Sequence, residues 1–311
     1  MARKKIALVG AGQIGGNLAL LAAQKELGDV ILFDIPAAEG LAKGKALDMQ
    51  QMSTIERYDS VLTGSSNYDD LKGADVVIIT AGIPRKPGMS REDLLDTNLK
   101  IMTNVANELK RVCPDAFMIN IANPLDAMVY ALKKITGGTK QKIVGMSGIL
   151  DTARFKSFIS SELNVSMKDV TALVLGGHGD DMVPITRLTT VGGVPVNELI
   201  KKDKLDAIVD RTRKGGAELV GLYKTGSAYF APAAAAIEMA EAYLKDQRRI
   251  IPVCTWLEGE FGINELYFGV PAVIGANGVE KVVTFELTAD EKAMMEKSAA
   301  SVRKTAAETK L

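Results

Sequence analysis

The sequence has few of the residues that build disulfide frameworks and metal centres. Its 311 residues include two cysteines, Cys113 and Cys254, and one histidine, His178. Two cysteines do not make a disulfide framework or a cysteine-rich zinc site, and one histidine excludes a centre built from several histidines. We therefore expect no metal site and a reducing, cytoplasmic location, with any histidine chemistry confined to His178.

The chain also has no net charge, because it contains 38 Lys+Arg and 38 Asp+Glu residues. Such a chain lacks the field that attracts nucleic acid or anionic lipid. Its longest apolar runs, such as ADVVIITAGI, are much shorter than the ~20 residues of a membrane-spanning helix. The N-terminal MARKKIALVGAG leads into a strand pattern without the apolar segment of a signal peptide. We expect a small-molecule partner, and neither nucleic acid nor membrane.

The first half of the chain alternates apolar strand-like runs with helical segments. Near-continuous apolar runs are typical of parallel strands covered on both faces, and their alternation with helices predicts a doubly wound sheet. We expect strands at 5–10, 30–35, 74–82, 116–123 and 142–146, and helices near 13–27, 39–53, 91–111 and 125–136.

The pattern changes after about residue 147. Short apolar segments with antiparallel character alternate with helices near 150–162, 203–223 and 227–243, and Thr288 and Glu291 form the capping box of a last helix. Because no linker separates the halves, we predict two tightly packed domains in an α/β protein. Residues 1–145 would form a Rossmann doubly wound parallel sheet, and residues 146–311 a mixed α+β catalytic domain.

The stretch GAGQIG (10–15) matches the G-x-G-x-x-G pattern of dinucleotide-binding turns. It follows an expected strand and opens an expected helix. Gly10 permits a tight turn, Gly12 lets a pyrophosphate approach the backbone, and Gly15 lets the helix pack on the strand. Asp34, at the end of the second strand, is placed to bind ribose hydroxyls and to repel a 2′-phosphate. We therefore expect NAD as the cofactor rather than NADP, bound over residues that include Gln13 and Ile14.

Two further stretches carry candidate chemistry. LVLGGHGDD (173–181) sets His178 among glycines, and ILDTARF (149–155) places Asp151 and Arg154 on one face of a helix. An aspartate that follows an apolar run needs a partner, and His178 is the candidate, with its tautomer set by the carboxylate. Arg154 could bind a substrate carboxylate bidentately, through the planar fork of its guanidinium. The alternatives are that His178 has only a structural role and that Asp151 and Arg154 form an ordinary surface ion pair.

Together these stretches resemble the lactate/malate dehydrogenase family. GAGQIG, Asp34, AGIPRKPGMSR, NIANP, ILDTARF and GGHGD follow the family's order and spacing over essentially the whole chain, most like the lactate-dehydrogenase-like malate dehydrogenases of bacteria. The resemblance implies that His178 exchanges a proton with the substrate oxygen and that Asp151 pairs with it. It also implies that Arg154 binds the C1 carboxylate. Asn123 would bond the substrate oxygen beside the nicotinamide and precede a cis bond to Pro124.

Within this resemblance, the loop AGIPRKPGMSR (81–91) carries the residues expected to distinguish malate from lactate. The family's malate-specific members carry arginine where this chain has Arg85, which would bind the second carboxylate of the substrate. Arg91 would polarise the reacting carbonyl as a glycine- and proline-hinged lid closes. Lys86 is read as a solvated cation, and a solvated surface loop is the alternative for the whole segment. Ala228 would leave room for a large substrate.

The sequence thus predicts an NAD-dependent enzyme that interconverts (S)-malate and oxaloacetate. A lactate or broad 2-hydroxy acid dehydrogenase is the nearest alternative, and a non-catalytic NAD-binding regulator is another. An NAD-dependent glycosidase is disfavoured because the single histidine is committed. Asn98 is assigned to the cofactor site, and the family implies a homo-oligomer, either a dimer or a tetramer.

Overall fold

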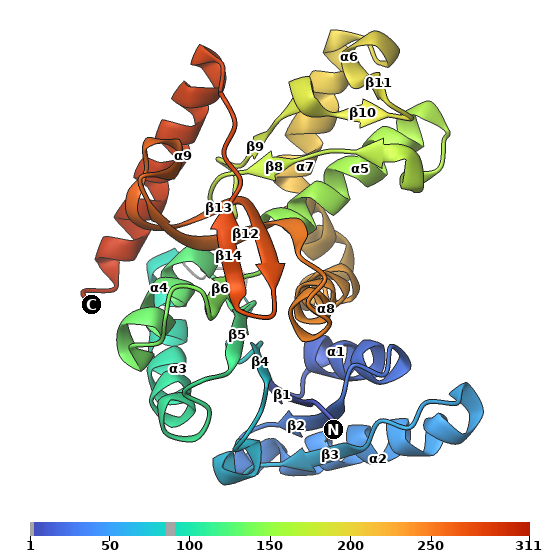
Figure 1. Cartoon of the computed structure of the whole chain (residues 1–311), viewed down its shortest axis with the longest axis vertical. Coiled ribbons are helices and arrows are strands. Elements are labelled where there is room, and N and C mark those ends of the chain that lie inside the picture. Colours follow the sequence, from blue (N-terminus) through green and yellow to red (C-terminus); the bar gives the residue numbers. More distant parts are fainter. Residues whose placement is uncertain (1–2, 85–90) are drawn as a thin grey trace.

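Nine strands form one sheet through the centre of the computed structural model, which describes residues 3–84 and 91–311 apart from the Arg91 side chain. The strands are β1 Lys5–Val9, β2 Asp29–Phe33, β3 Leu62–Ser65, β4 Val76–Ile79, β5 Phe117–Asn120, β6 Ile143–Gly145, β12 Arg249–Glu258, β13 Asn264–Gly275 and β14 Gly278–Val282. Their order is β14-β13-β12-β6-β5-β4-β1-β2-β3, and Figure 1 shows the sheet between two layers of helices.

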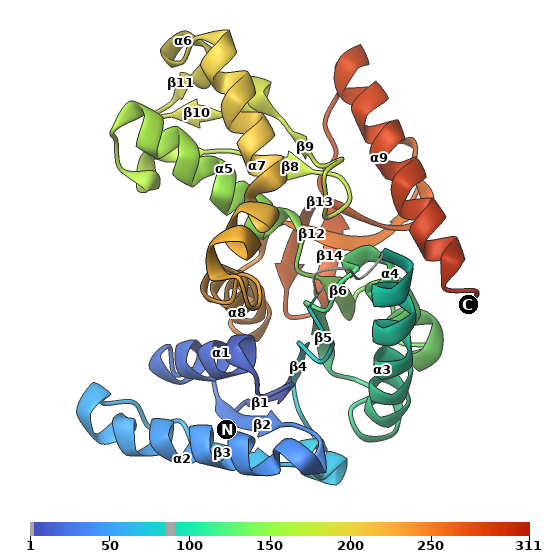
Figure 2. The same ribbon diagram turned by 180° about the vertical axis from the view of Figure 1, so that it is seen from behind.

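The parallel half of this sheet is buried on both faces. Along β1, Ile6 and Leu8 enter one apolar core while Ala7 and Val9 enter another. The first core is covered by α1 Gln13–Gln24, α2 Glu39–Glu56 and α8 Phe230–Leu244, and the second by α3 Arg91–Val112 and α4 Leu125–Thr136. These helices lie on opposite sides of the sheet in both views (Figure 1 and Figure 2). The predicted doubly wound sheet is therefore confirmed.

Strand β1 lies between β4 and β2, so the strands that follow it are added first on one side of β1 and then on the other. In open α/β sheets, ligands bind outside the carboxyl ends of the strands at such a switch point. The glycine turn that follows β1 therefore lies where a dinucleotide is expected.

The second half of the chain adds to this sheet and builds a separate layer beyond it. Strand β12 joins β6 in an antiparallel bridge, with Cys254 opposite Gly145. Two small sheets, β11-β10-β7 and β8-β9, pack with α5, α7 and α9 around two further apolar cores. The elements here are α5 Gly148–Leu163, β7 Val170–Thr171, β8 Val174–Leu175, β9 Val183–Pro184, β10 Thr190–Val191, β11 Val194–Pro195, α6 Val196–Leu199, α7 Lys202–Tyr223 and α9 Ala289–Glu308.

The expected strands and longer helices agree with the observed ones to within a few residues, but the short helix α6 and two strands were missed. Strands β3 and β14 were not predicted, since LTGS and GVEKV are short and contain glycine or charge. The capping box before α9 is present, with Thr288 and Glu291 bonded to each other's backbone N–H groups. The division at residue 145 stays a prediction, because the sheet is continuous across it. Within the described residues, no helix combines the length and apolar character needed to cross a bilayer.

Candidate active site

The glycine turn after β1 has the tight geometry that a dinucleotide requires. Gly10 has φ +112°, a conformation that other residues rarely adopt. A Cβ on Gly15 would lie 1.9 Å from the Gly10 carbonyl oxygen, so α1 packs against the turn only through glycine. A Cβ on Gly12 would instead meet no protein atom within 4 Å. The turn is thus closed toward the protein and open on the side where a pyrophosphate would lie.

Asp34 lies beside this turn at the end of β2. Its carboxylate accepts hydrogen bonds from the backbone N–H groups of Ala11 and Ile35, both at 2.8 Å. These contacts fix the carboxylate at the mouth of the turn and leave lone pairs that can accept ribose hydroxyls. Together with the N–H groups of the first turn of α1, which includes Gln13 and Ile14, the residues present fit NAD.

A lysine that the sequence analysis did not single out also fixes the turn. Lys45, on α2, donates from Nζ to the carbonyl oxygens of Ala11 at 2.9 Å and Gly12 at 2.7 Å. Burial lowers the pKa of Lys45, and the charge of Asp34 partly offsets this effect. No local pattern points to this contact, because Lys45 lies more than thirty residues beyond the turn.

The candidate catalytic cluster joins α5 to the loop that follows β8. The Nδ1 atom of His178 lies 2.8 Å from Oδ2 of Asp151, and Nη1 of Arg154 donates to Oδ1 of the same carboxylate at 3.2 Å. The Asp151 side chain is only 2% exposed, against 14% for His178 and 15% for Arg154. The structure therefore brings the three residues together, and their pairing is buried rather than a surface ion pair.

Electrostatics favour the protonated form of His178. Burial alone would lower the pKa of the imidazole, but the charge and hydrogen bond of Asp151 outweigh it, so the pKa is raised above its ordinary value. Arg154 works against this rise and Asp126 supports it. Because Asp151 occupies Nδ1, the Nε2 atom is the one available for exchanging a proton with a ligand.

Asn98 and Asn123 join the segments that follow β4 and β5. The peptide bond between Asn123 and Pro124 is cis, as the family resemblance implies. Asn98 is 1% exposed and donates to the carbonyl oxygens of Asn123 at 2.6 Å and Ile83 at 3.1 Å, while it accepts from the Ile83 N–H at 2.8 Å. Both amide hydrogens of Asn98 are thus used by the backbone of these two segments.

The predicted lid residues are only partly described. Helix α3 begins at Arg91, but the Arg91 side chain, Arg85 and Lys86 lie outside the described residues. Ala228 is half-buried in the segment between α7 and α8. The assignments made for the three cations therefore remain predictions from the sequence.

A second carboxylate touches the His178 segment and was also missed by the sequence analysis. Asp126, in the first turn of α4, accepts a hydrogen bond from the His178 backbone N–H at 3.1 Å and one from the Cys254 thiol at 3.3 Å. Its position just after NIANP suggested only a helix start. The contacts arise from chain segments that are distant in the sequence.

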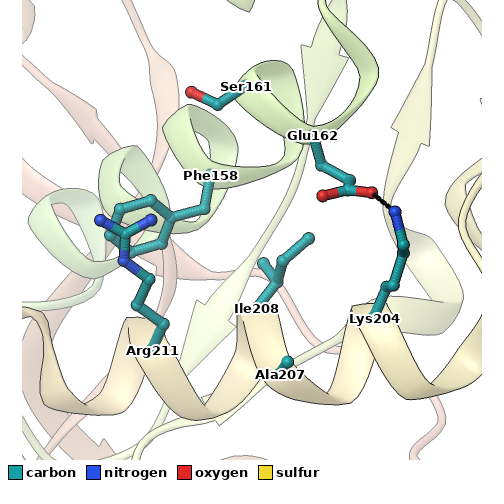
Figure 3. A pocket seen from close by; sticks show the side chains of 7 residues that line it. All are labelled: Phe158, Ser161, Glu162, Lys204, Ala207, Ile208 and Arg211. Carbon is teal, nitrogen blue, oxygen red and sulfur yellow. Dashed lines mark hydrogen bonds and ion pairs between the residues drawn. The ribbon is translucent and has the colours of Figure 1, made fainter.

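A separate pocket of about 300 Å³ opens between α5 and α7 (Figure 3). Its charged side chains are already paired, because Lys204 binds Glu162 and the Arg211 guanidinium lies 4.2 Å from the centre of the Phe158 ring. None of its lining residues is a predicted site residue. The chemistry therefore lies with His178 rather than with this pocket.

Comparison with known proteins agrees with the geometry. Residues 4–145 match the family model described as lactate/malate dehydrogenase, NAD binding domain, and residues 149–310 match its alpha/beta C-terminal domain. A malate dehydrogenase of Myxococcus xanthus is 64% identical over 99% of this chain and 98% of its own.

Two solved structures from Cryptosporidium parvum superpose closely on this fold. Its malate dehydrogenase has a TM-score of 0.96 at 47% identity, covering 99% of both chains. Its lactate dehydrogenase, solved with lactic acid and nicotinamide adenine dinucleotide, has a TM-score of 0.96 at 44% identity, covering 100% of this chain and 99% of that one. With both family models matched, this chain belongs to the lactate/malate dehydrogenase family.

Proposed function

We propose that this protein is an NAD-dependent malate dehydrogenase that interconverts (S)-malate and oxaloacetate. The observation that carries the proposal is the buried Asp151 carboxylate, which binds the imidazole of His178 and the guanidinium of Arg154 at once. This arrangement presents a proton carrier beside a carboxylate receptor. It suits a 2-hydroxy acid whose hydroxyl and carboxylate lie on adjacent carbons.

Residues 1–145 form the cofactor half of the proposed site. NAD, when bound, supplies the hydride acceptor for malate oxidation. The chain contributes the glycine turn, with Gly10, Gly12 and Gly15, and the carboxylate of Asp34, which favours NAD over NADP. Asn98 contributes by holding the Asn123 backbone.

Residues 146–311 supply the proton chemistry. During malate oxidation, Nε2 of His178 accepts the proton of the C2 hydroxyl, and the buried Asp151 stabilises the imidazolium that results. In oxaloacetate reduction the protonated imidazole returns this proton to the C2 oxygen. The raised pKa of His178 stabilises the imidazolium, which is the form that reduction requires.

The remaining site residues orient the substrate in this proposal. Arg154 binds the C1 carboxylate, and Asn123 bonds the C2 oxygen. Arg91 polarises the carbonyl, and Arg85 binds the second carboxylate that distinguishes oxaloacetate from pyruvate. The roles of the last two rest on the sequence.

The lactate alternative is not favoured, because the relative at 64% identity is a malate dehydrogenase, whereas the lactate dehydrogenase structure above is 44% identical.

We place the enzyme in the cytoplasm as a homo-oligomer. Exposed apolar side chains on α2, among them Leu47 at 60% and Ile55 at 77% exposure, support an interface with a second copy. Mass measurement in solution tests the assembly.

The substitution Arg85→Gln tests the proposed function, and Lys86→Gln is the matched control. A charged hydrogen bond to the second carboxylate is worth about 1.5–3 kcal/mol, so kcat/KM for oxaloacetate should fall roughly 10–150-fold in Arg85→Gln. Turnover of pyruvate should not fall, because the substitution removes a cation that is unpaired opposite its methyl group, and Lys86→Gln should resemble the wild type. Equal losses with both substrates would contradict the proposed selector.

A further inference from the structure

Asp126 occupies a junction between three parts of the chain. It lies in the first turn of α4, and its two carboxylate oxygens are used by different partners. Oδ2 accepts the backbone N–H of His178 at 3.1 Å, and Oδ1 accepts the thiol of Cys254 on β12 at 3.3 Å. One carboxylate therefore ties α4, the loop after β8 and the central sheet together.

The same turn carries the residue proposed to bind the substrate oxygen. Asn123 precedes Asp126 by three positions, and its carbonyl oxygen is held by Asn98 at 2.6 Å. The segment from Asn123 to Asp126 is thus anchored to α3 at one end and to the His178 backbone at the other. The spacing between the Asn123 amide and the imidazole depends on both anchors.

The charge of Asp126 also has a specific counterpart. Asp126 is half-buried, and burial raises the pKa of its carboxyl on balance, although the positive charge of His178 and the two donors lower it. Burial also raises the pKa of the Cys254 thiol well above its usual range, so this group remains a neutral donor. The imidazolium of His178 is therefore the cation that compensates the carboxylate.

We propose that Asp126 is a positioning residue, which fixes His178 relative to Asn123 and supplies a second negative charge that stabilises the imidazolium. This inference rests on the proposed malate dehydrogenase function for its kinetic consequence but not for its electrostatic one. Asp126 contacts the backbone of His178 rather than any reacting atom, so it acts through the histidine.

The groups that face His178 come from two helices. Helix α5 contributes Asp151, bonded to the ring, and Arg154, whose positive charge opposes protonation. Helix α4 contributes Asp126, whose negative charge favours protonation. Strand β12 contributes the neutral Cys254 thiol through its bond to Asp126. Among the described residues, loss of the Asp126 charge leaves the carboxylate of Asp151 against the guanidinium of Arg154, so the imidazolium becomes less stable.

The single histidine of this chain makes a direct test available, because a histidine-labelled sample without a histidine tag gives the NMR signals of one imidazole. Asp126→Asn keeps an acceptor for the His178 N–H and removes the charge. We expect the midpoint of the His178 titration to move to lower pH by roughly 0.5–1 unit. The control Asp181→Asn removes a carboxylate from the same loop, one that pairs with Lys297 at 2.9 Å, and should leave the midpoint in place.

Kinetics provide the second readout. In Asp126→Asn the loss of oxaloacetate reduction at high pH should begin at lower pH than in the wild type, with kcat reduced more than the KM for oxaloacetate is changed. In Asp126→Ala, which also loses the N–H acceptor, kcat should fall about tenfold further. Asp126→Glu should recover part of the pH profile, since it restores the charge.

An unchanged His178 titration in folded Asp126→Asn would overturn the inference, whatever the enzyme's substrate. If the titration moves while wild-type protein fails to reduce oxaloacetate, the proposed function is wrong and the electrostatic role of Asp126 stands. If Asp126→Asn does not fold, Asp126→Ser replaces it, because serine also lacks the charge and is smaller. The same shift of the His178 midpoint to lower pH is expected, and no shift there would also contradict the inference.

Discussion

Replacing Asp151 by asparagine tests the energetic basis of the catalytic cluster. The substitution keeps the size of a side chain that is 2% exposed and removes the charge that binds His178 at 2.8 Å and Arg154 at 3.2 Å. A hydrogen bond between charged groups is worth about 1.5–3 kcal/mol, and about 1.4 kcal/mol corresponds to one pKa unit. The pKa of His178 should therefore fall by roughly 1–2 units.

This shift predicts the loss in rate. Oxaloacetate reduction requires the imidazolium, so above the wild-type pKa the protonated fraction, and with it kcat/KM, should fall about 10–100-fold in Asp151→Asn. Malate oxidation should also fall. If the asparagine amide donates to Nδ1, the ring proton moves to Nε2, which then cannot accept the substrate proton.

The assay is the pH dependence of kcat/KM in both directions, with saturating cofactor, together with the NMR titration of His178. Asp181→Asn again serves as the control, because its carboxylate pairs with Lys297 instead of the imidazole. A folded Asp151→Asn enzyme with wild-type rates and an unshifted profile would refute the reasoning.

Three further predictions concern stability and cofactor binding. The pKa of His178 is raised in the folded protein from its ordinary 6.5, so its contribution to the free energy of unfolding is fully present below about pH 6.5 and is lost as pH rises through the folded pKa. Urea unfolding of the wild type and of Asp151→Asn across this pH range measures the contribution. Gly15→Ala should lower the free energy of unfolding by about 1–3 kcal/mol, because its Cβ would lie 1.9 Å from a backbone oxygen. Gly12→Ala, whose Cβ meets no protein atom, should melt like the wild type but bind NADH more weakly in a fluorescence titration. Asn98→Leu should cost about 1–3 kcal/mol in thermal unfolding and raise the KM for NADH, and Asn104→Leu on the exposed face of α3 should do neither.

The parallel half of the fold could be predicted because its strands carry their own signal. ADVVIITAG and AFMINIAN are short, near-continuous apolar runs, which are typical of parallel strands covered on both faces. Strand β3, with the sequence LTGS, carries no such signal, since its place at the sheet edge depends on pairing with β2. The continuation of the sheet from β6 into β12 likewise depends on a single bridge between Cys254 and Gly145, which no local pattern encodes.

The same distinction applies to the candidate site. The contact between Asp151 and His178 could be anticipated because an aspartate after an apolar run needs a partner and the chain offers one histidine. Lys45 and Asp126 could not, because each acts through backbone groups that approach it only in the folded chain. Backbone groups are present at every position, so the sequence does not mark those that will become partners.

The most direct test of the account compares oxaloacetate and pyruvate as substrates for NADH-dependent reduction by the wild-type protein. We expect kcat/KM for oxaloacetate to exceed that for pyruvate by a factor on the order of 10²–10⁴, because Arg85 is proposed to bind the second carboxylate and would stay unpaired opposite a methyl group. A higher kcat/KM with pyruvate would contradict the proposed function.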